Sequence, residues 1–503
     1  MASSSLPASE PATASAGPST RRLFFSVFPS IMLPMFLAAI DQTIVSTALP
    51  AIAGDLGDVE RISWVVVSYL VANTIAAPVY GRLGDVLGRR RLMFVALAVF
   101  VIASVLCAIA PSVLALTAAR LLQGLGGGGL MTLSQALVGQ IVPPRERGRY
   151  QGYLASVFVC SSTFGPVAGG WLTQHFGWQS VFMINVPLGI VALVMATRLP
   201  QPAASGGRFT FDGIGLALFA SFIAPLLLGL EQAQRFDPAT LPIALVLFAV
   251  AGCSVLLLIR QERRARVPLL PVKLLRQSAI WRCDLMAACN GATIVSFVTF
   301  IPIYLQVVRG LGPSDTGLLL LPFTMFIAIG ALFTGQTIAR TGRTAIVPSI
   351  ALPISTVAIA SLALLAPHLP LGRLPFLFCL ISLTTGTAMT VVQTTVQALA
   401  GPKQLGAAAA SVQFSRSIGA AVGAALVGAV LFGTLFRTDP ETARLFGRLV
   451  EAGPAALAQV APAHLASVRG EIADAFRAAF LLIAVFSAGG ALLAWSLPVR
   501  RIQ

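Results

Sequence analysis

Fourteen apolar segments of helix length run through this sequence, separated by short polar turns. Each segment is close to or longer than the roughly 20 residues that an α-helix needs to cross a bilayer. Inside lipid every backbone N–H and C=O group must be satisfied within the protein, so spanning segments of this kind are helical. We therefore predict an all-α integral membrane protein with fourteen transmembrane helices. The segments are residues 24–53, 62–80, 92–110, 112–134, 150–172, 178–198, 212–230, 240–259, 283–308, 315–338, 345–366, 374–399, 406–433 and 476–498.

Composition and the placement of charge exclude a soluble domain and argue against a nucleic-acid-binding protein. Apolar residues make up 56% of the chain and charged residues only 10%, which is too little polar surface for a soluble domain. The net charge of +16 would suit nucleic acid, but the cations cluster in short turns between apolar segments. Basic turns mark the cytoplasmic side of a membrane protein. We therefore expect a multi-pass protein of the cytoplasmic (inner) membrane, in contact with membrane lipid, with both termini in the cytoplasm.

An internal repeat divides the chain into related halves. The pattern of Gly81, Gly88 and Arg89 recurs with identical spacing from Gly335 to Arg343. Parallel repeats around a central cavity are one way in which secondary transporters achieve alternating access. The predicted divisions are a disordered cytoplasmic tail at 1–20, a six-helix bundle at 21–200, two inserted helices with a basic cytoplasmic linker at 201–282, and a second six-helix bundle at 283–503 with a long outer loop at 434–474.

Asp41 and Arg120 are charged residues deep within apolar segments. A charge at the bilayer centre costs roughly 2.5–3.5 kcal/mol, so an intramembrane acid indicates a functional site. At 1.5 Å per residue, Asp41 lies about 18 Å and Arg120 about 13 Å from the outer ends of their segments, in the same leaflet. Burial favours a neutral carboxyl group and a nearby guanidinium favours the carboxylate, so movement of the arginine would switch proton binding. We predict that Asp41 carries a proton and Arg120 tunes it; the alternative is a permanent ion pair joining the two helices.

The turn at 81–91, GRLGDVLGRRR, combines an acid, Asp85, with arginines and glycines. Glycines permit close approach of a second backbone, and a carboxylate here can bind a neighbouring helix N-terminus or an arginine. We predict that Asp85 latches an inner gate that opens when the two halves rock. The alternative is that the arginines only fix the topology. The remaining predicted gating residues are Gly81, Gly88, Arg89 and Arg90.

Motifs along the first half of the chain carry a family resemblance. Residues 81–91 resemble a signature loop, with Val86 where that pattern usually has a basic residue. Residues 39–50 resemble a first-span motif, and Arg120 with Gln123 resembles a fourth-span motif implicated in proton transfer. Together they resemble the major facilitator superfamily and, within it, the fourteen-spanner drug:proton antiporter family. That resemblance implies two six-helix bundles with two inserted central helices.

A fifth-span sequence bears on the direction of transport. Gly165, Pro166, Gly169 and Gly170 lie in GPVAGG, which resembles a motif associated with antiporters. The resemblance therefore favours export over uptake.

Substrate contacts are predicted on the ninth segment. Thr293, Phe297, Phe300 and Tyr304 share one helical face and would line an aromatic drug pocket. The alternative is that this stripe is ordinary helix packing or lipid contact. Gln123 completes the predicted substrate cavity.

Missing motifs exclude other classes of protein. The chain has no GxxxxGK[ST] loop for ATP and neither a GxSxG nor an HExxH motif, so we expect no enzyme, no catalytic residues, no metal and no cofactor apart from the proton gradient. We predict a proton-coupled multidrug efflux antiporter that exports small lipophilic drugs or toxic compounds by alternating access. The alternatives are an exporter of one metabolite or siderophore, or an uptake symporter. Expected partners are a small-molecule substrate, protons and, for crossing a second membrane, a periplasmic adaptor with an outer-membrane channel.

Overall fold

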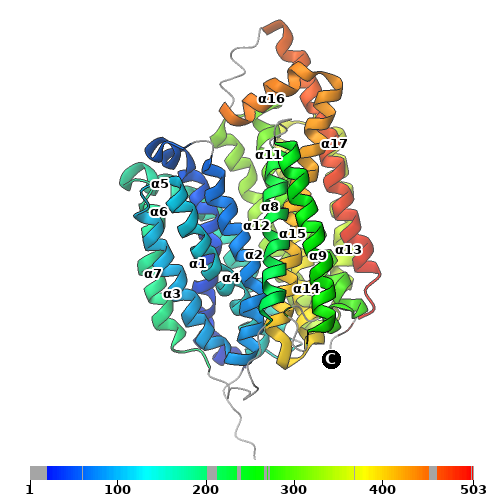
Figure 1. The fold of residues 1–503 in the computed structure, drawn as a ribbon. Coiled ribbons are helices and arrows are strands. Elements are labelled where there is room, and N and C mark those ends of the chain that lie inside the picture. Colours follow the sequence, from blue (N-terminus) through cyan, green and yellow to red (C-terminus); the bar gives the residue numbers. More distant parts are fainter. Residues whose placement is uncertain are drawn as a thin grey trace, which may run out of the picture.

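The computed structural model describes residues 20–58, 61–144, 146–200, 212–234, 240–265, 269, 272–367, 369–452, 462–499 and 501. Its described regular structure is helical, and long helices stand side by side (Figure 1). The only β pairing among these residues is an isolated bridge between Arg343 and Arg501. The predicted all-α class is therefore confirmed. Residues 1–19 of the predicted tail and 201–211 of the predicted linker lie outside the described residues.

The helices fall into three groups along the chain. The first group comprises α1 Thr20–Leu56, α2 Ile62–Leu87, α3 Arg89–Ala108, α4 Val113–Ile141, α5 Arg147–Phe176, α6 Ser180–Met183 and α7 Asn185–Ala196. The middle group comprises α8 Gly213–Gln234, α9 Leu241–Arg264 and α10 Val272–Leu275. The last group comprises α11 Ser278–Val307, α12 Pro313–Thr341, α13 Ile346–Leu365, α14 Leu374–Ala400, α15 Leu405–Thr438, α16 Pro440–Ala452 and α17 Pro462–Trp495.

Twelve helices of the described chain are long and apolar enough to cross a membrane, which makes this a multi-pass membrane protein. The other two predicted segments differ in kind. The segment at 150–172 lies in α5, a helix of 30 residues whose hydropathy is lowered by its polar side chains. The segment predicted as one helix at 178–198 is a shorter apolar helical stretch over Ser180–Ala196, in which α6 passes into α7 at Ile184.

The same packing arrangement occurs twice. In the first bundle, α1–α7, the pairs α1–α5, α2–α4, α3–α4 and α3–α7 are in contact. In the second bundle, α11–α17, the corresponding pairs are α11–α15, α12–α14, α13–α14 and α13–α17. The inserted helices α8 and α9 pack on each other, and α8 also contacts α2 and α15. Helices at equivalent positions of the two bundles therefore have equivalent neighbours.

The predicted outer loop at 434–474 is largely helical, which corrects the sequence prediction. α15 and α17 have 34 residues each, which is about 51 Å at 1.5 Å per residue and well beyond the roughly 30 Å of hydrocarbon. Their ends extend past the other helices and carry α16 between them (Figure 1). Residues 453–461 lie outside the described chain.

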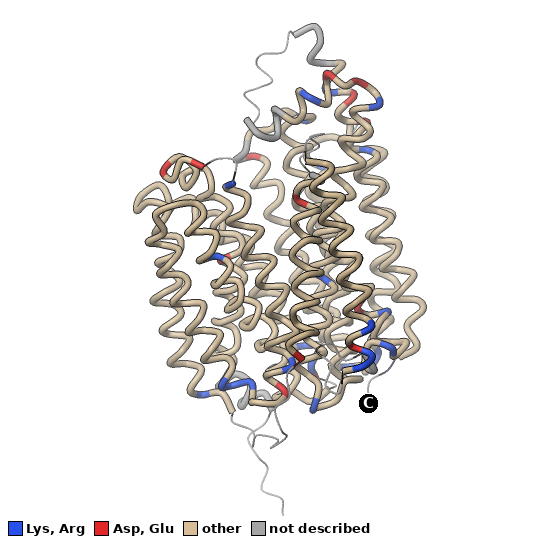
Figure 2. Tube along the Cα trace, in the orientation of Figure 1, with Lys and Arg blue, Asp and Glu red and all other residues tan. Residues whose placement is uncertain are grey.

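The two bundles meet through α2 with α15 and α5 with α12. A methyl group at Gly81 of α2 would lie 2.5 Å from the Gly406 carbonyl oxygen of α15, so only glycine permits this approach. These contacts lie toward one end of the molecule, where α2 and α14 finish and where Lys and Arg gather (Figure 2). We call it the basic end.

Candidate functional site

Asp41 lies in α1 in the interior of the first bundle, where its side chain is fully buried. Three donors surround its carboxylate: Arg120 Nη1 at 2.5 Å from Oδ2, and Gln123 Nε2 at 3.0 Å and Asn185 Nδ2 at 2.9 Å from Oδ1. N–H donors of this kind stabilise a carboxylate in its charged form. The Asp41 side chain is therefore held by hydrogen bonds from two other helices, α4 and α7.

Arg120 reaches Asp41 from α4 and is itself buried. Its Nε donates to the Val65 carbonyl oxygen of α2 at 3.2 Å, and Nη1 also donates to Gln123 Oε1 at 2.7 Å. The Tyr69 ring lies beneath the guanidinium, 4.2 Å from Cζ to the ring centroid. A guanidinium over an aromatic face is stabilised by the ring quadrupole. Arg120 thus connects α1, α2 and α4 around one buried charge pair.

Further polar side chains complete a network that sequence reasoning did not assemble. Gln123 donates to Ser104 Oγ of α3 at 2.8 Å, so Gln123, predicted to face a substrate, belongs to the shell around Asp41. Asn185 is the first residue of α7 and donates to Asp41 from there. Nothing in the sequence distinguishes Ser104 or Tyr69 from other polar residues in apolar segments. Proximity to Asp41 is what assigns them to the site.

Two of the four glycine-motif residues in α5 pack directly on the helix that carries Asp41. A methyl group at Gly165 would overlap Thr43, and one at Gly169 would overlap the Ile44 backbone. Small residues of this kind let membrane helices approach closely. Gly170 has no neighbour within 4 Å of an added methyl group, so it takes no part in this contact. Pro166 lies inside α5 between the two packing glycines.

Asp85 joins the two bundles at the basic end. Its Oδ1 accepts a hydrogen bond from the Gly406 backbone N–H at 2.9 Å, and its Oδ2 accepts one from Ala407 at 3.1 Å, in the first turn of α15. Arg89 Nη2 lies 2.5 Å from Oδ1, and Arg89 Nη1 donates to Gln140 Oε1 at 2.5 Å. A carboxylate at a helix N-terminus is stabilised by the free N–H groups and the helix dipole. Gly88 follows Leu87 with φ +95, which allows the turn into α3.

Other cross-bundle hydrogen bonds lie near the same end. Arg147 Nη1 donates to the Gln397 carbonyl oxygen at 3.1 Å, and Gln397 Nε2 donates to the Gln135 carbonyl oxygen at 3.1 Å. Gln393 Nε2 lies 3.2 Å from Gln135 Oε1. These bonds close the basic end. Arg90, the remaining predicted gating residue, has no ion pair among the described residues.

The predicted substrate stripe on α11 is corrected by the structure. Phe297, Phe300 and Tyr304 are buried in the apolar core of the second bundle. Phe297 stacks on Phe323 of α12 with 4.7 Å between ring centroids, so the stripe serves packing. Helical periodicity shows that the four residues share a face, but it does not show what that face contacts.

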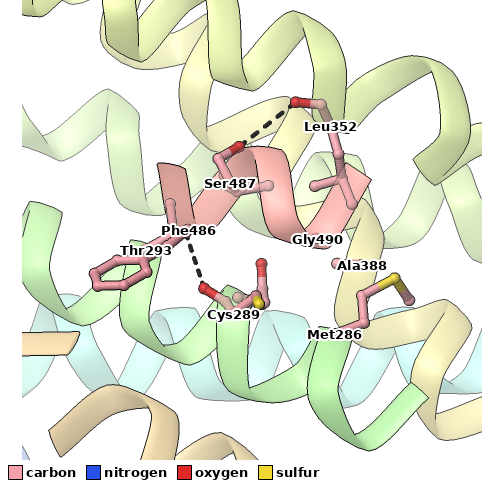
Figure 3. A pocket seen from close by; sticks show the side chains of 10 residues that line it. Met286, Cys289, Thr293, Leu352, Ala388, Phe486, Ser487 and Gly490 are labelled. Atoms are coloured by element: carbon pink, nitrogen blue, oxygen red, sulfur yellow. Dashed lines mark hydrogen bonds between the residues drawn. The ribbon is translucent and has the colours of Figure 1, made fainter. Parts of the chain in front are cut away.

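Thr293, the fourth residue of the stripe, lines a small cavity inside the second bundle (Figure 3). Side chains from α11, α13, α14 and α17 enclose it, including Cys289, Leu352 and Ser487. The cavity offers about 10 Å³ to the centre of a water-sized sphere, which is close to the lower limit for one water molecule. It is too small for a drug.

Asp284 of α11 is a second buried acid, in the interior of the second bundle. Its side chain is 6% exposed and accepts a 3.3 Å hydrogen bond from Ser411 Oγ of α15. Its Oδ2 has no partner in the described chain. Among the described residues no group of three or more His, Cys, Asp or Glu side chains could hold a metal ion.

A helical membrane protein with two similarly packed bundles, and with polar contacts between them at one end, has the architecture of a secondary transporter. The model of the Major Facilitator Superfamily matches residues 31–424, and the chain belongs to this family.

Relatives and solved structures agree with this assignment. An uncharacterized MFS-type transporter of Mycobacterium tuberculosis is 33% identical over 415 residues, which are 82% of this chain and 60% of that protein, so the chain spans about 60% of that relative's length. The multidrug transporter protein MdtP of Bacillus subtilis is 30% identical over 403 residues, 80% of this chain and 74% of the relative. The crystal structure of the human organic anion transporter MFSD10 superposes with a TM-score of 0.64 at 16% identity, over 95% of this chain and 100% of that one. This likeness shows the all-helical major facilitator fold.

Proposed function

We propose that the protein is a proton-coupled antiporter that exports small lipophilic compounds by alternating access. The observation that carries this proposal is the buried Asp41 carboxylate with its three side-chain donors from α4 and α7. A charge at this depth is costly in lipid. A titrating role gives this costly group a function, because proton binding would release Arg120 and its contacts to α2 and α4.

The proposed cycle links this site to the latch at the basic end. In the present arrangement Asp41 is paired with Arg120 while Asp85 holds the N-terminus of α15. A proton that reaches Asp41 would neutralise one member of the ion pair. The helices that Arg120 connects would then shift, and the bundles would rock around their central contacts. Asp85, Gly81 and Arg89 would release and re-form the latch at each turnover.

The names of related proteins favour drugs as the exported compounds. Related proteins include the multidrug transporter protein MdtP and multidrug resistance protein 3 of Bacillus subtilis, and the efflux pump dotC of Dothistroma septosporum. We infer that the basic end faces the cytoplasm, following the positive-inside rule. We propose that in this orientation the protein lies in the inner membrane and is a member of the fourteen-spanner antiporter branch. It would work with an adaptor and an outer-membrane channel.

The test is proton release from everted membrane vesicles on addition of lipophilic drugs and dyes, with wild type and Asp41→Asn at matched expression. We expect substrate-induced proton release in wild type and none in Asp41→Asn, because Asn cannot take up a proton. Asp58→Asn is the matched control, since Asp58 is a partly exposed acid outside the membrane helices and should leave release unchanged. Coupled export that persists in Asp41→Asn would refute the role of Asp41. Substrate-induced proton uptake by wild-type vesicles with the same polarity would indicate symport.

A further inference from the structure

Arg416 of α15 is a cation at the junction of the two bundles. It lies about 17 Å along the helix axis from Leu405, at 1.5 Å per residue, and therefore near the middle of the hydrocarbon. Its guanidinium carbon is 5.4 Å from the ring centroid of Phe158 in α5, a helix of the opposite bundle. The side chain thus points across the interface between bundles.

No group of the described chain neutralises this charge. Among the described residues no ion pair or hydrogen bond reaches the Arg416 side chain. The side chain is partly exposed, and none of its nitrogens is among the buried atoms that lack a partner. The guanidinium nitrogens, which together carry five N–H donors, therefore keep some exposed surface at the junction of the two bundles and have no hydrogen-bond partner in the described chain.

The two acids in the bundle interiors cannot serve as its counterions. Asp41 is fully buried and already holds Arg120. Asp284 is packed inside the second bundle, where its free oxygen is buried and its other oxygen binds Ser411. Among the described charges of the membrane interior, Arg416 is thus the unpaired one that is open to the junction, and no open carboxylate is present to attract a cation.

We propose that Arg416 is the specificity-determining residue of the substrate path and selects lipophilic aromatic anions, such as carboxylates or sulfonates. This inference rests on the proposed transport function and names its substrate class. A guanidinium presents a planar fork of donors that matches such groups, and the Phe158 ring supplies apolar surface beside it. A carboxylate that arrives here replaces weak contacts with water and an aromatic face by a charge-assisted hydrogen-bonded pair.

The charge of the substrate also suits antiport against a proton. Export of a monoanion in exchange for one entering proton moves two positive charges inward, so the membrane potential and the pH gradient both drive the cycle. Export of a dication against one proton would oppose the potential. An anion-selective path therefore requires only the single titrating carboxylate, Asp41.

The first test uses the purified wild-type protein in detergent, without any gradient. Binding of 1-naphthalenesulfonate is compared with binding of its uncharged analogue, 1-naphthalenesulfonamide, and with binding of the cation ethidium. We expect the sulfonate to bind about tenfold or more tightly than the sulfonamide, which is the size of effect expected for a charge-assisted hydrogen bond. Equal affinities for the two naphthalene compounds, or tighter binding of ethidium, would overturn the proposal without any variant being made.

Variants then assign the selectivity to this residue. Arg416→Gln should weaken binding of the sulfonate about tenfold and leave the sulfonamide unchanged, and Arg416→Lys should restore part of the loss. Arg437→Gln is the matched control, because Arg437 is an exposed arginine near the far end of the same helix. A sulfonate affinity unaltered by Arg416→Gln would overturn the assignment. If sulfonate binding depends on Arg416 but the vesicles release no protons, the specificity of Arg416 stands and proton antiport is refuted.

Discussion

The interior of the first bundle is charged and hydrogen bonded, whereas the interior of the second is aromatic, although equivalent helices pack in both. In the first bundle Asp41 and Arg120 join α1 to α4, and Gln123 extends the network to α3. In the second bundle Phe297 of α11 stacks on Phe323 of α12 and meets Phe378 of α14 edge-on. The helices that a salt bridge connects in one half are thus connected by rings in the other.

This difference indicates a division of labour within a repeated fold. Desolvating a charge pair costs several kcal/mol per ion, and a buried pair is often no more stabilising than apolar residues of similar volume. The aromatic core shows that this packing arrangement does not require a buried ion pair at the equivalent helix contact. Selection for stability therefore does not explain the pair in the first bundle, whereas the proton exchange proposed above would.

The largest effect should follow from breaking the charge pair. Arg120→Leu leaves the Asp41 carboxylate buried without its counterion, so we expect the free energy of unfolding to fall by about 3–5 kcal/mol. The double variant Asp41→Asn, Arg120→Leu should recover much of this loss, because no charge then remains in the site. Denaturant unfolding of the purified protein in detergent would measure both. A double variant as unstable as the sum of its single changes would show that the two side chains act independently.

The next effect concerns a helix contact that occurs in equivalent form within each bundle, α1 with α5 and α11 with α15. A methyl group at Gly169 would overlap the Ile44 backbone of α1, and one at Gly419 of α15 would overlap the Ala288 backbone of α11. We expect Gly169→Ala and Gly419→Ala each to cost about 1–3 kcal/mol, since overpacking forces backbone shifts. Gly170→Ala is the matched control because its methyl group meets nothing within 4 Å. Thermal unfolding of the three variants provides the measurement. A loss confined to one bundle would break the equivalence of the two packing arrangements.

The fold was predictable because the constraint of lipid on the backbone is simple. Long apolar segments must be helical, and residue counts at fixed rise per residue were enough to place Asp41 and Arg120 at matching depths. The partners Ser104, Tyr69 and Asn185 were not predictable as a set, because their contacts depend on how helices rotate about their axes. The sequence does not show whether a polar side chain in an apolar segment faces lipid, another helix or a cavity.

The errors have the same physical origin. Thr293, Phe297, Phe300 and Tyr304 do share one helical face, but the three aromatic residues face the apolar core and not a substrate cavity. Periodicity cannot distinguish a cavity from a core. Asn185 donates to Asp41 from the start of α7, and hydropathy alone does not show which way a polar side chain in that segment faces.

A smaller effect is expected at the latch between the bundles. Asp85→Asn keeps an oxygen for the Gly406 N–H but loses the ion pair with Arg89 and the charge at the N-terminus of α15. We expect about 1–2 kcal/mol less stabilisation of the closed basic end. Spin labels at Leu87 and Lys403 would report the change as a larger population of long distances. Asp58→Asn, just before the opposite end of α2, should leave the distribution unaltered, and an unaltered distribution in Asp85→Asn would argue against a latch.

The smallest effect is expected at Asp439, an acid of the second bundle. Like Asp41 it accepts three hydrogen bonds, but it is in contact with water. Asp439 accepts hydrogen bonds from the Thr442 hydroxyl at 2.7 Å and from the backbone N–H groups of Thr442 and Glu441 at 3.0 Å, at the start of α16. The Thr442 hydroxyl, together with these N–H groups, lowers the pKa of Asp439 below its ordinary value.

A lowered pKa fixes the pH range in which this cap contributes stability. The contribution is fully present above the unfolded pKa of about 3.9 and is lost as pH falls through the lower folded value. Asp439→Ala should therefore increase amide hydrogen exchange in the first turn of α16 at neutral pH, and the difference from wild type should shrink when the carboxylate is protonated in acid. Transport should not change, because water already solvates this carboxylate and no cycle step depends on it. An Asp439→Ala variant that lost proton coupling as Asp41→Asn does would show that burial is not what separates the two acids.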